Sequence, residues 1–465
     1  MADQFDLLVL GSGPGGYVAA IRAAQWGLRT GVIEKDDRLG GTCLNVGCIP
    51  TKALLYSAEI FDLVKRAKEF GIECGEPKLL FDAVRQRQSR VVTKHNKGIE
   101  FLFRKNKIET IRGFGKLQGS GKIVVEGPEG KRELNAKSII LATGSEARML
   151  PGLAPDKDRI LTNREILETK TVPASLLIIG AGAVGVEFAS IYQRFGSEVT
   201  LIEMLPRVLP VEDQEISQEL EKALKKQGIK ILTNTPVQSV TKKAAGVEVV
   251  ITKPGGPETL KAEQVLVAVG RRPNTENIGL DKTRAKVERG FVATDRFMRT
   301  DEPGLFAIGD LVAGAPQLAH AASMEGLVAV ATICGKPVAP MNFDQIPGCT
   351  YCEPQVASVG LTEAEAKRRG HAVKIGKFPL MANSKASILG AHEGMVKLVC
   401  DEKYGEILGA HMIGPSVTEL IAEVTAAMRL EATAEDLMYI VHAHPTLSEA
   451  MLDAANAVYS LAINA

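Results

Sequence analysis

The chain has 465 residues, which is too long for one hydrophobic core and predicts about three domains. Its 56 lysines and arginines almost balance its 55 aspartates and glutamates, so the net charge of +1 gives no indication of a nucleic-acid or membrane partner. Hydrophobic residues make up 45% of the chain and charged residues 24%, which is typical of a soluble globular protein.

The seven cysteines are scattered along the chain and odd in number, which argues against the disulfide framework of a small secreted protein. No basic and then apolar leader precedes the first strand pattern, and no unbroken apolar run reaches the roughly 18 residues of a membrane span. We therefore expect a reducing compartment, and the bacterial cytoplasm as the location.

The N-terminal segment has the pattern of a nucleotide-binding strand, turn and helix. Residues 5–10 predict a buried parallel strand, which is followed by a helix and by a second strand that ends at Glu34. Between the first strand and the helix lie Gly11, Gly13 and Gly16, in the spacing G-x-G-x-x-G. In this motif the glycines make the turn, admit the pyrophosphate and let the helix pack on the strand. Glu34 is placed to accept hydrogen bonds from an adenosine ribose.

The same pattern returns 169 residues later, with Gly180, Gly182 and Gly185, and with Glu203 closing its second strand. One such motif is weak evidence, but two copies with an acid at the same offset strongly indicate two dinucleotide sites. Glu203 would bond a free 2′-hydroxyl and repel a 2′-phosphate, and no arginine pair follows it directly, although Arg207 lies near. The second site is expected to prefer NAD over NADP.

Each half closes with an apolar strand that ends in a glycine, Gly144 in the first half and Gly270 in the second. Between its acid and this glycine the first half is about 43 residues longer than the second, if both are Rossmann-like. The surplus contains a cysteine pair and two expected helices, near residues 49–70 and 81–105. The sequence thus predicts a duplicated fold of which one copy carries a dithiol.

Cys43 and Cys48 lie five residues apart in the run GGTCLNVGCIPTK, a few residues after the first nucleotide-binding motif. A thiol pair this close can form a small disulfide ring. A helix is expected after Pro50, and a helix N-terminus favours the negative charge of a thiolate and lowers its pKa. The alternative is two buried cysteines in a loop, but the neighbouring motifs favour a redox pair.

From about residue 345 the pattern predicts a third, α+β module without a glycine motif. Its expected strands and its first helix cover residues 355–360, 373–379, 395–400, 407–413 and 417–430.

The tail of this module contains the run HAHPTLSE at residues 442–449. Pro445 is expected in the first turn of a helix, with His444 just before that helix and Glu449 on it. A carboxylate that orients an imidazole through one nitrogen leaves the other nitrogen for proton transfer. A histidine near a helix start is more often structural, and His442, which has no such partner argument, serves as the comparison.

Over essentially its whole length the sequence resembles the FAD-dependent pyridine nucleotide-disulfide oxidoreductases. The resemblance rests on both glycine motifs, the cysteine run, both strand-terminal glycines, the run GLFAIGD at residues 304–310 and the HPTLSE tail. It implies an α/β fold with two Rossmann-like dinucleotide-binding domains and a C-terminal α+β dimerisation domain. The expected parts are an FAD-binding domain with the dithiol (1–147), an NAD-binding domain (148–274), a central segment completing the FAD site (275–344) and the interface domain (345–465).

By this resemblance the first site holds FAD and the second NAD, and no metal is expected. Glu34 would bind the adenosine ribose, Asp310 the ribityl chain of the flavin, and Lys52 would lie near the flavin ring and pair with Glu187. The implied catalytic residues are Cys43, Cys48, His444 and Glu449. The implied cofactor-binding residues are Gly11, Gly13, Gly16, Glu34, Lys35, Lys52, Gly115, Thr143, Gly144, Gly309, Asp310, Gly180, Gly182, Gly185, Glu187, Glu203 and Gly270.

The resemblance further implies an enzyme that oxidises dihydrolipoamide to lipoamide through a Cys43–Cys48 disulfide, with Cys43 toward the substrate and Cys48 toward the flavin. His444, held by Glu449, would act as the base and would come from the partner subunit of a homodimer. The lipoyl group would belong to a protein of a 2-oxoacid dehydrogenase or glycine-cleavage complex, and the choice between these complexes stays open.

One feature departs from the family pattern, a C-x-x-C formed by Cys349 and Cys352 at the entry to the third module. A redox role would need a helix N-terminus, and zinc would need a second ligand pair. Residues three apart in a strand face opposite sides, so we expect neither chemistry.

Three other functions compete with this hypothesis. An NAD(P)H-dependent reductase of another small disulfide, such as glutathione disulfide, would carry arginines after the second acid, where Glu203 stands without them. A mercuric-ion reductase would carry a C-terminal cysteine pair, which this tail lacks. A flavoprotein scaffold or redox sensor would tolerate the loss of His444 or Glu449, yet both are present.

Overall fold

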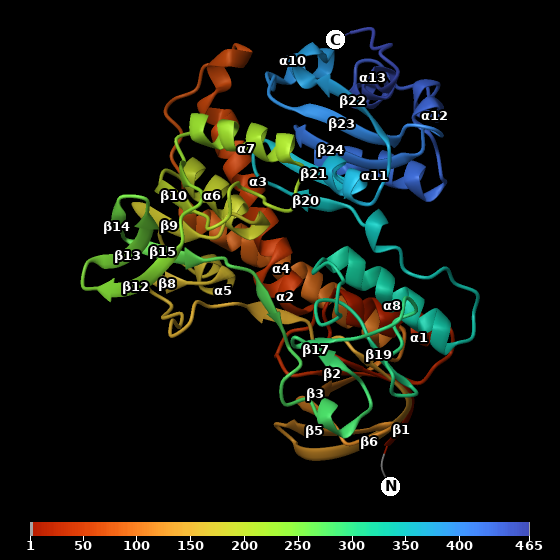
Figure 1. Cartoon of the computed structure of the whole chain (residues 1–465). Helices are drawn as coiled ribbons and strands as arrows, with labels where there is room; N and C mark the ends of the chain where they lie inside the picture. The colour runs from red at the N-terminus through yellow and green to blue at the C-terminus, as the bar shows by residue number, and fades with distance from the viewer. Residues whose placement is uncertain (1–2, 465) are drawn as a thin grey trace. The chain divides into compact units, whose positions relative to one another are not determined.

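The computed structural model describes residues 3–464. Its contacts divide the chain into two compact units, and each unit is assembled from three stretches of sequence (Figure 1). The first unit contains the chain up to Ala53, Asp82–Arg148 and Gly270–Phe343, and the second contains Leu54–Phe81, Met149–Val269 and the chain from Asp344. We describe each unit by itself.

The first unit is built on a seven-stranded sheet in the order β3-β2-β1-β6-β5-β4, with β19 also paired to β6. Its parallel strands are β1 (Asp3–Leu10), β2 (Thr30–Glu34), β3 (Glu109–Arg112), β6 (Gly130–Leu141) and β19 (Leu305–Ala307). The antiparallel strands are β4 (Phe114–Leu117) and β5 (Lys122–Gly127). Leu7 to Leu10 are all buried, as is usual for a parallel strand that is covered on both faces.

Helices α1 (Pro14–Gln25) and α8 (Ala319–Ile333) lie side by side in this unit (Figure 1). The dithiol insertion between β2 and β3 consists of α2 (Gly41–Val46), α3 (Cys48–Lys65), the 3-10 turn η1 (Ala67–Phe70) and α4 (Phe81–Lys105), of which α3 from Leu54 onward and η1 belong to the second unit. The two helices expected here are confirmed, although the first ends at Lys65. Two small antiparallel pairs complete the unit: β7 (Ser145–Ala147) with β16 (Arg271–Pro273), and β17 (Val287–Glu288) with β18 (Phe291–Val292).

The second unit contains a five-stranded parallel sheet in the order β11-β10-β9-β15-β8. Its strands are β8 (Ile160–Leu161), β9 (Ser175–Ile179), β10 (Glu198–Ile202), β11 (Lys230–Leu232) and β15 (Gln264–Val267). The order β11-β10-β9-β15 repeats β3-β2-β1-β6 of the first unit, which confirms the duplicated Rossmann-like fold. The remaining elements are α5 (Asn163–Leu167), α6 (Ala183–Phe195), α7 (Gln214–Lys226) and the antiparallel strands β12 (Val237–Lys243), β13 (Gly246–Lys253) and β14 (Gly256–Ala262).

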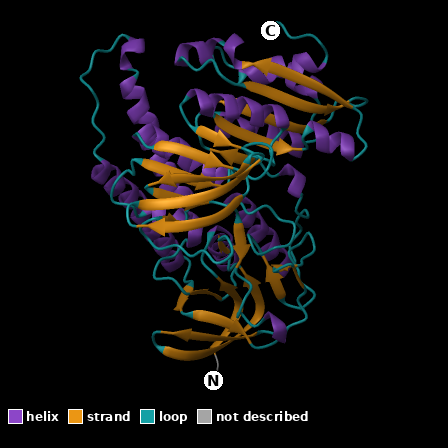
Figure 2. Cartoon of the chain, turned by 60° about the vertical axis from the view of Figure 1, so that its left-hand side comes forward, coloured by secondary structure: helices purple, strands orange, loops and turns teal. Residues whose placement is uncertain are grey.

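The C-terminal part of the second unit is an antiparallel sheet in the order β20-β21-β24-β23-β22, with helices beside it (Figure 2). Its strands are β20 (Gly348–Thr350), β21 (Gln355–Gly360), β22 (Val373–Pro379), β23 (Met395–Asp401) and β24 (Ile407–Gly414). The helices are α9 (Glu363–Arg368), α10 (Ser384–Leu389), α11 (Val417–Arg429), α12 (Ala434–Met438) and α13 (Glu449–Val458). The four strands and the helix expected here are confirmed to within one residue.

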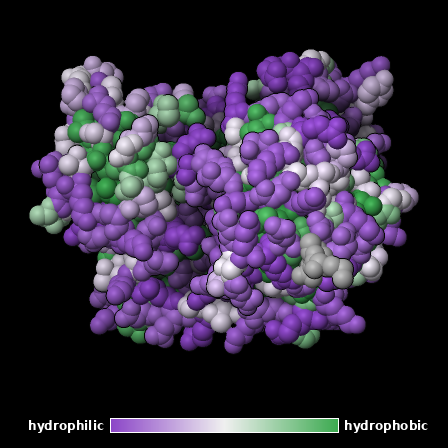
Figure 3. Space-filling model, turned by 90° about the horizontal axis from the view of Figure 1, so that it is seen from below, coloured by the Kyte–Doolittle hydropathy of each residue, from purple (hydrophilic) through white to green (hydrophobic). Residues whose placement is uncertain are grey.

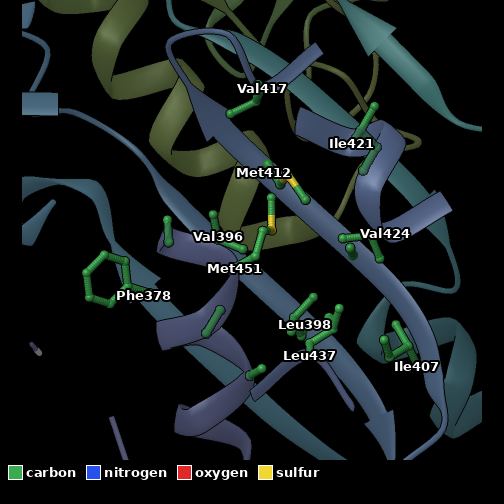
Figure 4. Packing of buried hydrophobic residues seen from close by; sticks show 14 of the residues in the cluster. Phe378, Val396, Leu398, Ile407, Met412, Val417, Ile421, Val424, Leu437 and Met451 are labelled. Carbon is green, nitrogen blue, oxygen red and sulfur yellow. The ribbon is translucent and has the colours of Figure 1, made fainter. Parts of the chain in front are cut away.

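One face of this antiparallel sheet forms a hydrophobic core with α11, α12 and α13 (Figure 4). Val396 and Leu398 of β23 and Met412 of β24 point into this core together with Val424 and Met451 from the helices. Successive residues of a strand face opposite sides, so the residues between them lie on the other face of the sheet. That other face carries polar side chains, whose partners are described below.

The expectation for Pro445 is wrong. Helix α13 begins only at Glu449, so Pro445 lies in the loop before the helix and not in its first turn. The hydroxyl of Thr446 donates to Ala443 O at 2.7 Å, and the amide of Thr446 donates to the Glu449 carboxylate at 2.8 Å. These bonds close a turn of their own, and the Thr446 amide is therefore not part of a helical ladder.

Polar residues cover most of the face seen in Figure 3, and the apolar residues on it form separate small groups. Within residues 3–464, no helix combines the length and the apolar character that crossing a bilayer requires.

Candidate active site

The first glycine motif has the geometry of a dinucleotide-binding turn. Gly11 has φ of +101°, and a Cβ there would lie 2.3 Å from Ala142 O. A Cβ on Gly16 would lie 2.0 Å from Gly11 O, so neither position accepts a side chain. A Cβ on Gly13, in contrast, would have no described atom within 4 Å. The middle glycine therefore borders open space at the start of α1, where the first backbone N–H groups of a helix attract phosphate.

The second motif repeats this geometry. Gly180 has φ of +103°, and a Cβ there would lie 2.4 Å from Ala268 O. A Cβ on Gly185 would lie 1.9 Å from Gly180 O, while one on Gly182 would again have no described atom within 4 Å. Both turns therefore fit a dinucleotide in the same way, with the pyrophosphate beside the middle glycine.

The two acids, each only 6% exposed, hold the turns that they follow. Glu34 Oε2 accepts from the Ser12 amide at 2.9 Å and from the Ser12 hydroxyl at 2.6 Å. Glu203 Oε2 accepts from the Ala181 amide at 2.7 Å, and its Oε1 accepts from the Leu205 amide at 2.9 Å. This bracing role of the two acids has no signal in the sequence motif. A carboxylate offers about four acceptor positions, so each acid retains capacity for a ribose hydroxyl.

The cysteine pair lies where two helices meet. Cys43 is in α2, and Cys48 is the first residue of α3. Gly47 joins the two helices, and a Cβ there would lie 2.9 Å from Thr42 O and 3.2 Å from Cys43 Cα. The absence of a side chain at Gly47 lets the chain turn back closely enough for the two thiols to form a hydrogen bond.

The expected lowering of a thiol pKa is not found for Cys43. The hydrogen bond to the Cys48 thiol raises the pKa of Cys43, burial raises it further, and the charge of Lys52 only partly opposes them. Cys43 stands inside the six-residue α2, whereas Cys48 stands at the N-terminus of α3. The hydrogen bond to Cys48 and burial thus disfavour the thiolate form of Cys43.

The dithiol segment packs directly against the first nucleotide turn. A Cβ on Gly41, the first residue of α2, would lie 2.7 Å from Gly13 Cα. The Gly40 amide lies 3.1 Å from the Ser12 hydroxyl and 3.0 Å from Ser12 O. The structure thus brings the cysteine pair and the first fingerprint together within one compact unit.

The segment between the cysteines is held by residues that the sequence analysis missed. Asn96, buried in the middle of α4, donates to Leu39 O at 2.8 Å and to Asn45 Oδ1 at 3.1 Å. The Thr51 hydroxyl donates to Gly47 O at 2.6 Å. A polar residue on the buried face of α4, whose other members include Val92, Ile99 and Phe103, is the signal that could have revealed Asn96.

Asp310 is held by Ser145 and Arg271, which were not expected from the sequence. The Ser145 hydroxyl bonds the Asp310 carboxylate and accepts from Arg271 Nε at 2.6 Å. Arg271 Nη2 also donates to Ser145 O at 2.7 Å, and its Nε lies 3.6 Å from Asp310 Oδ2. The adjacent Thr143 bonds Asn274 O at 2.7 Å through its hydroxyl. Asn274 also bonds Gly144 O through its amide, so Asn274 holds the predicted ligands Thr143 and Gly144, while Ser145 and Arg271 hold Asp310.

Glu325, on α8, is hydrogen-bonded to the backbone of the predicted ligand Gly309. The Gly309 amide donates to Glu325 Oε2 at 2.5 Å, and within residues 3–464 no hydrogen bond reaches the buried Oε1. Burial, helped by the charge of Asp310, raises the pKa of Glu325 to about 7. At neutral pH the Glu325 carboxyl group, which lies under the loop that carries Asp310, is therefore about half protonated.

The histidine motif contains two imidazole–carboxylate pairs and not one. His444 Nδ1 lies 2.9 Å from Glu449 Oε1, and the histidine side chain is 71% exposed. His442 Nε2 lies 2.8 Å from Glu423 Oε1, its Nδ1 lies 3.0 Å from Ile440 O, and its side chain is only 6% exposed. The expectation that His442 lacks a comparable partner is therefore wrong. Both ring nitrogens of His442 bond the chain, whereas within residues 3–464 the His444 ring bonds through Nδ1 alone and exposes its Nε2.

The other predicted residues lie in both units. Lys35 is exposed directly after Glu34, and Gly115 on β4 would bring a Cβ within 3.2 Å of Ile33. Lys52 lies on α3 in the first unit, and Glu187 lies on α6 in the second, where its Oε1 accepts from the Tyr351 amide at 3.0 Å. The pairing of Lys52 with Glu187 stays a prediction.

Cys349 and Cys352 occupy different environments. Cys349 is on β20 and packs against the core of the antiparallel sheet. Cys352 is buried after the strand, its sulfur lies 3.1 Å from Pro354 O, and burial raises its pKa. Such an environment disfavours the reactive thiolate.

The chain belongs to the pyridine nucleotide-disulphide oxidoreductase family, whose model matches residues 5–326, and the dimerisation-domain model of the same family matches residues 346–455. The resemblance stated from the sequence is thus confirmed. The cofactors are FAD and NAD, for which the two glycine turns are suited.

Individual relatives describe the similarity more specifically than the family models do. The chain is 48% identical over 467 residues to a dihydrolipoyl dehydrogenase of Zymomonas mobilis and 45% identical over 475 residues to one of Bacillus subtilis, and each match covers 100% of both chains. Among solved structures it is similar to LpdA from Mycobacterium tuberculosis, with a TM-score of 0.91 and 28% identity over 98% of this chain and 99% of that one. It is also similar to the HOCl-induced flavoprotein disulfide reductase RclA from Escherichia coli, with a TM-score of 0.86 and 25% identity over the same shares.

Proposed function

We propose that this chain is a dihydrolipoyl dehydrogenase, which oxidises dihydrolipoamide to lipoamide and reduces NAD. The observation that carries this proposal is the hydrogen-bonded pair of Cys43 and Cys48, packed against the first nucleotide turn. Relatives with this name are similar over the entire chain, which supports the choice of substrate. Glu203, buried behind the second turn, supports NAD over NADP as the acceptor.

In the proposed reaction Cys43 and Cys48 begin as a disulfide. One substrate thiolate attacks Cys43 Sγ, so that a substrate–Cys43 disulfide forms and Cys48 leaves as a thiolate. His444 of the partner subunit takes the proton of the second substrate thiol through Nε2, while Glu449 holds its Nδ1. The second substrate sulfur then attacks the first, which releases Cys43 and completes the ring of lipoamide. The first thiol loses its proton to solvent before it attacks, and His444 takes the second proton. The substrate has thus lost two protons and two electrons, and the cysteine pair has gained the two electrons.

Bound FAD would supply a two-electron acceptor for the Cys48 thiolate and a hydride donor for NAD. The residues proposed to hold FAD are the first glycine turn, Glu34, Lys35, Lys52, Gly115, Thr143, Gly144, Gly309 and Asp310. Those proposed to hold NAD are the second glycine turn, Glu187, Glu203 and Gly270. Ser145 and Arg271 would keep the Asp310 carboxylate oriented toward its ligand.

The assembly is part of the proposal. We propose a homodimer formed through the interface domain, residues 345–465, and a lipoyl group supplied by a protein of a 2-oxoacid dehydrogenase or glycine-cleavage complex. The match to a dimerisation-domain model supports the first point. The boundaries 1–147, 148–274 and 275–344 are proposed for the other domains. A cytoplasmic location is proposed because the seven cysteines, odd in number, do not form a secretory pattern.

The test is steady-state turnover of the purified, FAD-loaded protein with dihydrolipoamide and NAD, run beside NADPH with glutathione disulfide. Rapid NADH formation in the first assay, lost in a Cys48→Ser variant that retains FAD, is the expected result. Activity in the second assay alone would make the chain a reductase of another small disulfide. The Cys352→Ser variant is the matched control, because Cys352 is a buried cysteine outside the run GGTCLNVGCIPTK and its loss should not stop turnover.

A further inference from the structure

A row of polar side chains crosses the antiparallel sheet of the C-terminal module on the face opposite its hydrophobic core. Ser358 of β21 pairs with His411 of β24, His411 pairs with Lys397 of β23, and Lys397 pairs with Lys377 of β22. Residues directly opposite each other in a sheet share one face, so these four side chains form a continuous row. Burial lowers the pKa of His411, which therefore stays neutral beside Lys397.

The acidic start of α7, which belongs to the second nucleotide-binding half, lies on this row. Lys397 Nζ lies 3.1 Å from Asp213 Oδ2, 2.8 Å from Glu215 Oε2 and 2.9 Å from Glu363 Oε2 on α9. Lys377 Nζ lies 2.6 Å from Glu215 Oε1. A lysine that is 2% exposed is thus surrounded by three carboxylates, two of them from the first turn of α7 or its cap.

The charges of this cluster are mutually dependent. Burial alone would lower the pKa of Lys397, but its hydrogen bonds to Glu215 and Glu363, together with Asp213, raise that pKa above its usual value. Hydrogen bonds from Lys367 and then from Lys397 lower the pKa of Glu363 to about 2. A buried charge whose partner is removed is left uncompensated, so the cluster strongly favours the position in which α7 starts on the sheet.

The start of α7 is in turn connected to the second glycine turn. Asp213 caps α7 by accepting from the Glu215 amide at 3.0 Å. One turn further on, the buried Ser217 hydroxyl donates to Leu209 O at 3.1 Å. The Leu209 amide donates to Ala181 O, inside the glycine turn, at 2.8 Å.

The backbone conformation of Leu209 depends on these contacts. Its φ is +42°, in the left-handed region where a leucine is disfavoured. Such a conformation persists only when the surrounding structure imposes it. Here it is imposed on one side by Ala181 and on the other by Ser217, whose helix is anchored to Lys397.

From this chain of contacts we propose that Lys397 is a positioning residue for the NAD site: it fixes the start of α7, and through Ser217 and Leu209 it fixes the loop between Glu203 and Asp213. The C-terminal module thereby sets the shape of the second dinucleotide site, although Lys397 itself touches neither the second glycine motif nor Glu203. This inference rests on the proposed binding of NAD at the second glycine turn.

The test measures NAD binding to the oxidised, FAD-loaded enzyme by titration calorimetry, without any lipoyl substrate. The Lys397→Met variant should raise the NAD dissociation constant roughly tenfold, the size of a typical coupling between sites. Its KM for NAD should rise while its FAD content, its flavin spectrum and its KM for dihydrolipoamide stay as in the wild type. Amide hydrogen exchange in the peptide around Leu209 should be faster.

Two further variants make the result decisive. Ser217→Ala removes the bond to Leu209 O without unbalancing a buried charge, and it should weaken NAD binding in the same direction. Lys226→Met removes an exposed ion pair with Glu393 at the other end of α7 and should leave NAD binding unchanged. If Lys397→Met fails to retain FAD, Ser217→Ala decides alone.

Wild-type affinity for NAD in a folded Ser217→Ala or Lys397→Met enzyme, with no change in exchange at Leu209, would overturn the inference. A wild-type enzyme that binds NAD but does not oxidise dihydrolipoamide would instead contradict the proposed function, because binding is measured without the substrate. The two failures are therefore distinguishable.

Discussion

Asn96 of α4 is hydrogen-bonded to Asn45, which lies between the two redox cysteines. The Asn96 amide donates to Asn45 Oδ1 at 3.1 Å, and the Asn45 amide donates to Leu39 O and to Gly41 O, each at 3.0 Å. The short helix that carries Cys43 is thus held from its own start and from a separate helix. A dithiol that must be attacked at one sulfur and release the other benefits from such a fixed geometry.

Replacing Asn96 by alanine should loosen this helix. The partly buried Asn45 Oδ1 and the Leu39 carbonyl would lose a donor, which we expect to lower the free energy of unfolding by about 1 kcal/mol. Turnover with dihydrolipoamide should fall about tenfold, because small displacements of reacting groups are costly. Thermal unfolding and steady-state kinetics of the FAD-loaded variant measure both effects. Asn106→Ala is the control, since Asn106 follows directly after α4 and its side chain bonds Leu102 O in the last turn of that helix, and it should leave turnover intact.

The two histidines of the tail should respond differently to substitution. His444→Gln removes the exposed imidazole and should lower turnover about 100-fold or more, as expected for the loss of a general base. His442→Gln retains a side chain that can bond Glu423, and its loss should stay below about tenfold. Stopped-flow reduction of the enzyme by dihydrolipoamide gives the comparison. Equal losses in the two variants, with flavin spectra unchanged, would show that His442 also takes part in proton transfer.

Glu203→Gln should weaken the NAD site and its selectivity together. The amide group cannot accept from both the Ala181 and the Leu205 N–H, so a buried donor is left unsatisfied and the KM for NAD should rise about tenfold. The lost negative charge also ceases to repel a 2′-phosphate, so the preference for NAD over NADP should narrow. Glu34→Gln is the matched control in the first half: it should weaken FAD retention and spare the ratio of NAD to NADP activity.

Glu325 should make stability depend on pH near neutrality. Its folded pKa of about 7 lies above the unfolded value of 4.5, so the folded state binds more protons between these pH values and stability falls as pH rises through this window. Glu325→Gln mimics the protonated acid and should therefore be more stable than the wild type at pH 8, by about 2 to 3 kcal/mol, and nearly equal to it at pH 4.5. Denaturant unfolding at the two pH values tests this.

The pKa of Glu302 is shifted downward, in the opposite direction to that of Glu325, so Glu302 serves as a comparison. The amide of Arg284 lowers the pKa of Glu302, so its contribution to stability is present at neutral pH and is lost as pH falls through the lowered pKa. Glu302→Gln should be less stable than the wild type at pH 8, and the difference should shrink in acid. A Glu325→Gln enzyme that shows the same trend as Glu302→Gln would contradict the raised pKa of Glu325.

Much of the fold could be predicted because its signals are local. The two glycine motifs, the strands that flank them and the strands of the C-terminal sheet are short patterns, and they lie within a residue or two of their expected positions. The helix start near Pro445 was wrong because proline at a first turn is only a preference, and the Thr446 hydroxyl and amide are engaged in a separate turn.

The contacts that complete the site could not be predicted in the same way. Asn96 and Leu39 are separated by 57 residues, Ser145 and Asp310 by 165, and Lys397 and Asp213 by 184. Only folding brings such residues together, and composition or periodicity carries no trace of their pairing. The pKa of Cys43 was missed for a related reason, because burial and the bond to Cys48 outweigh the helix effect expected from sequence.

A methyl group on Gly41 would lie 2.7 Å from Gly13 Cα, so the residue at position 41 has no room for a side chain. Any enlargement of Gly41 would therefore displace the thiol-bearing helix or the phosphate-binding turn. The nucleotide site and the redox pair must consequently be inherited as one block, so an evolutionary or engineered exchange of this cofactor turn has to carry the cysteine segment with it.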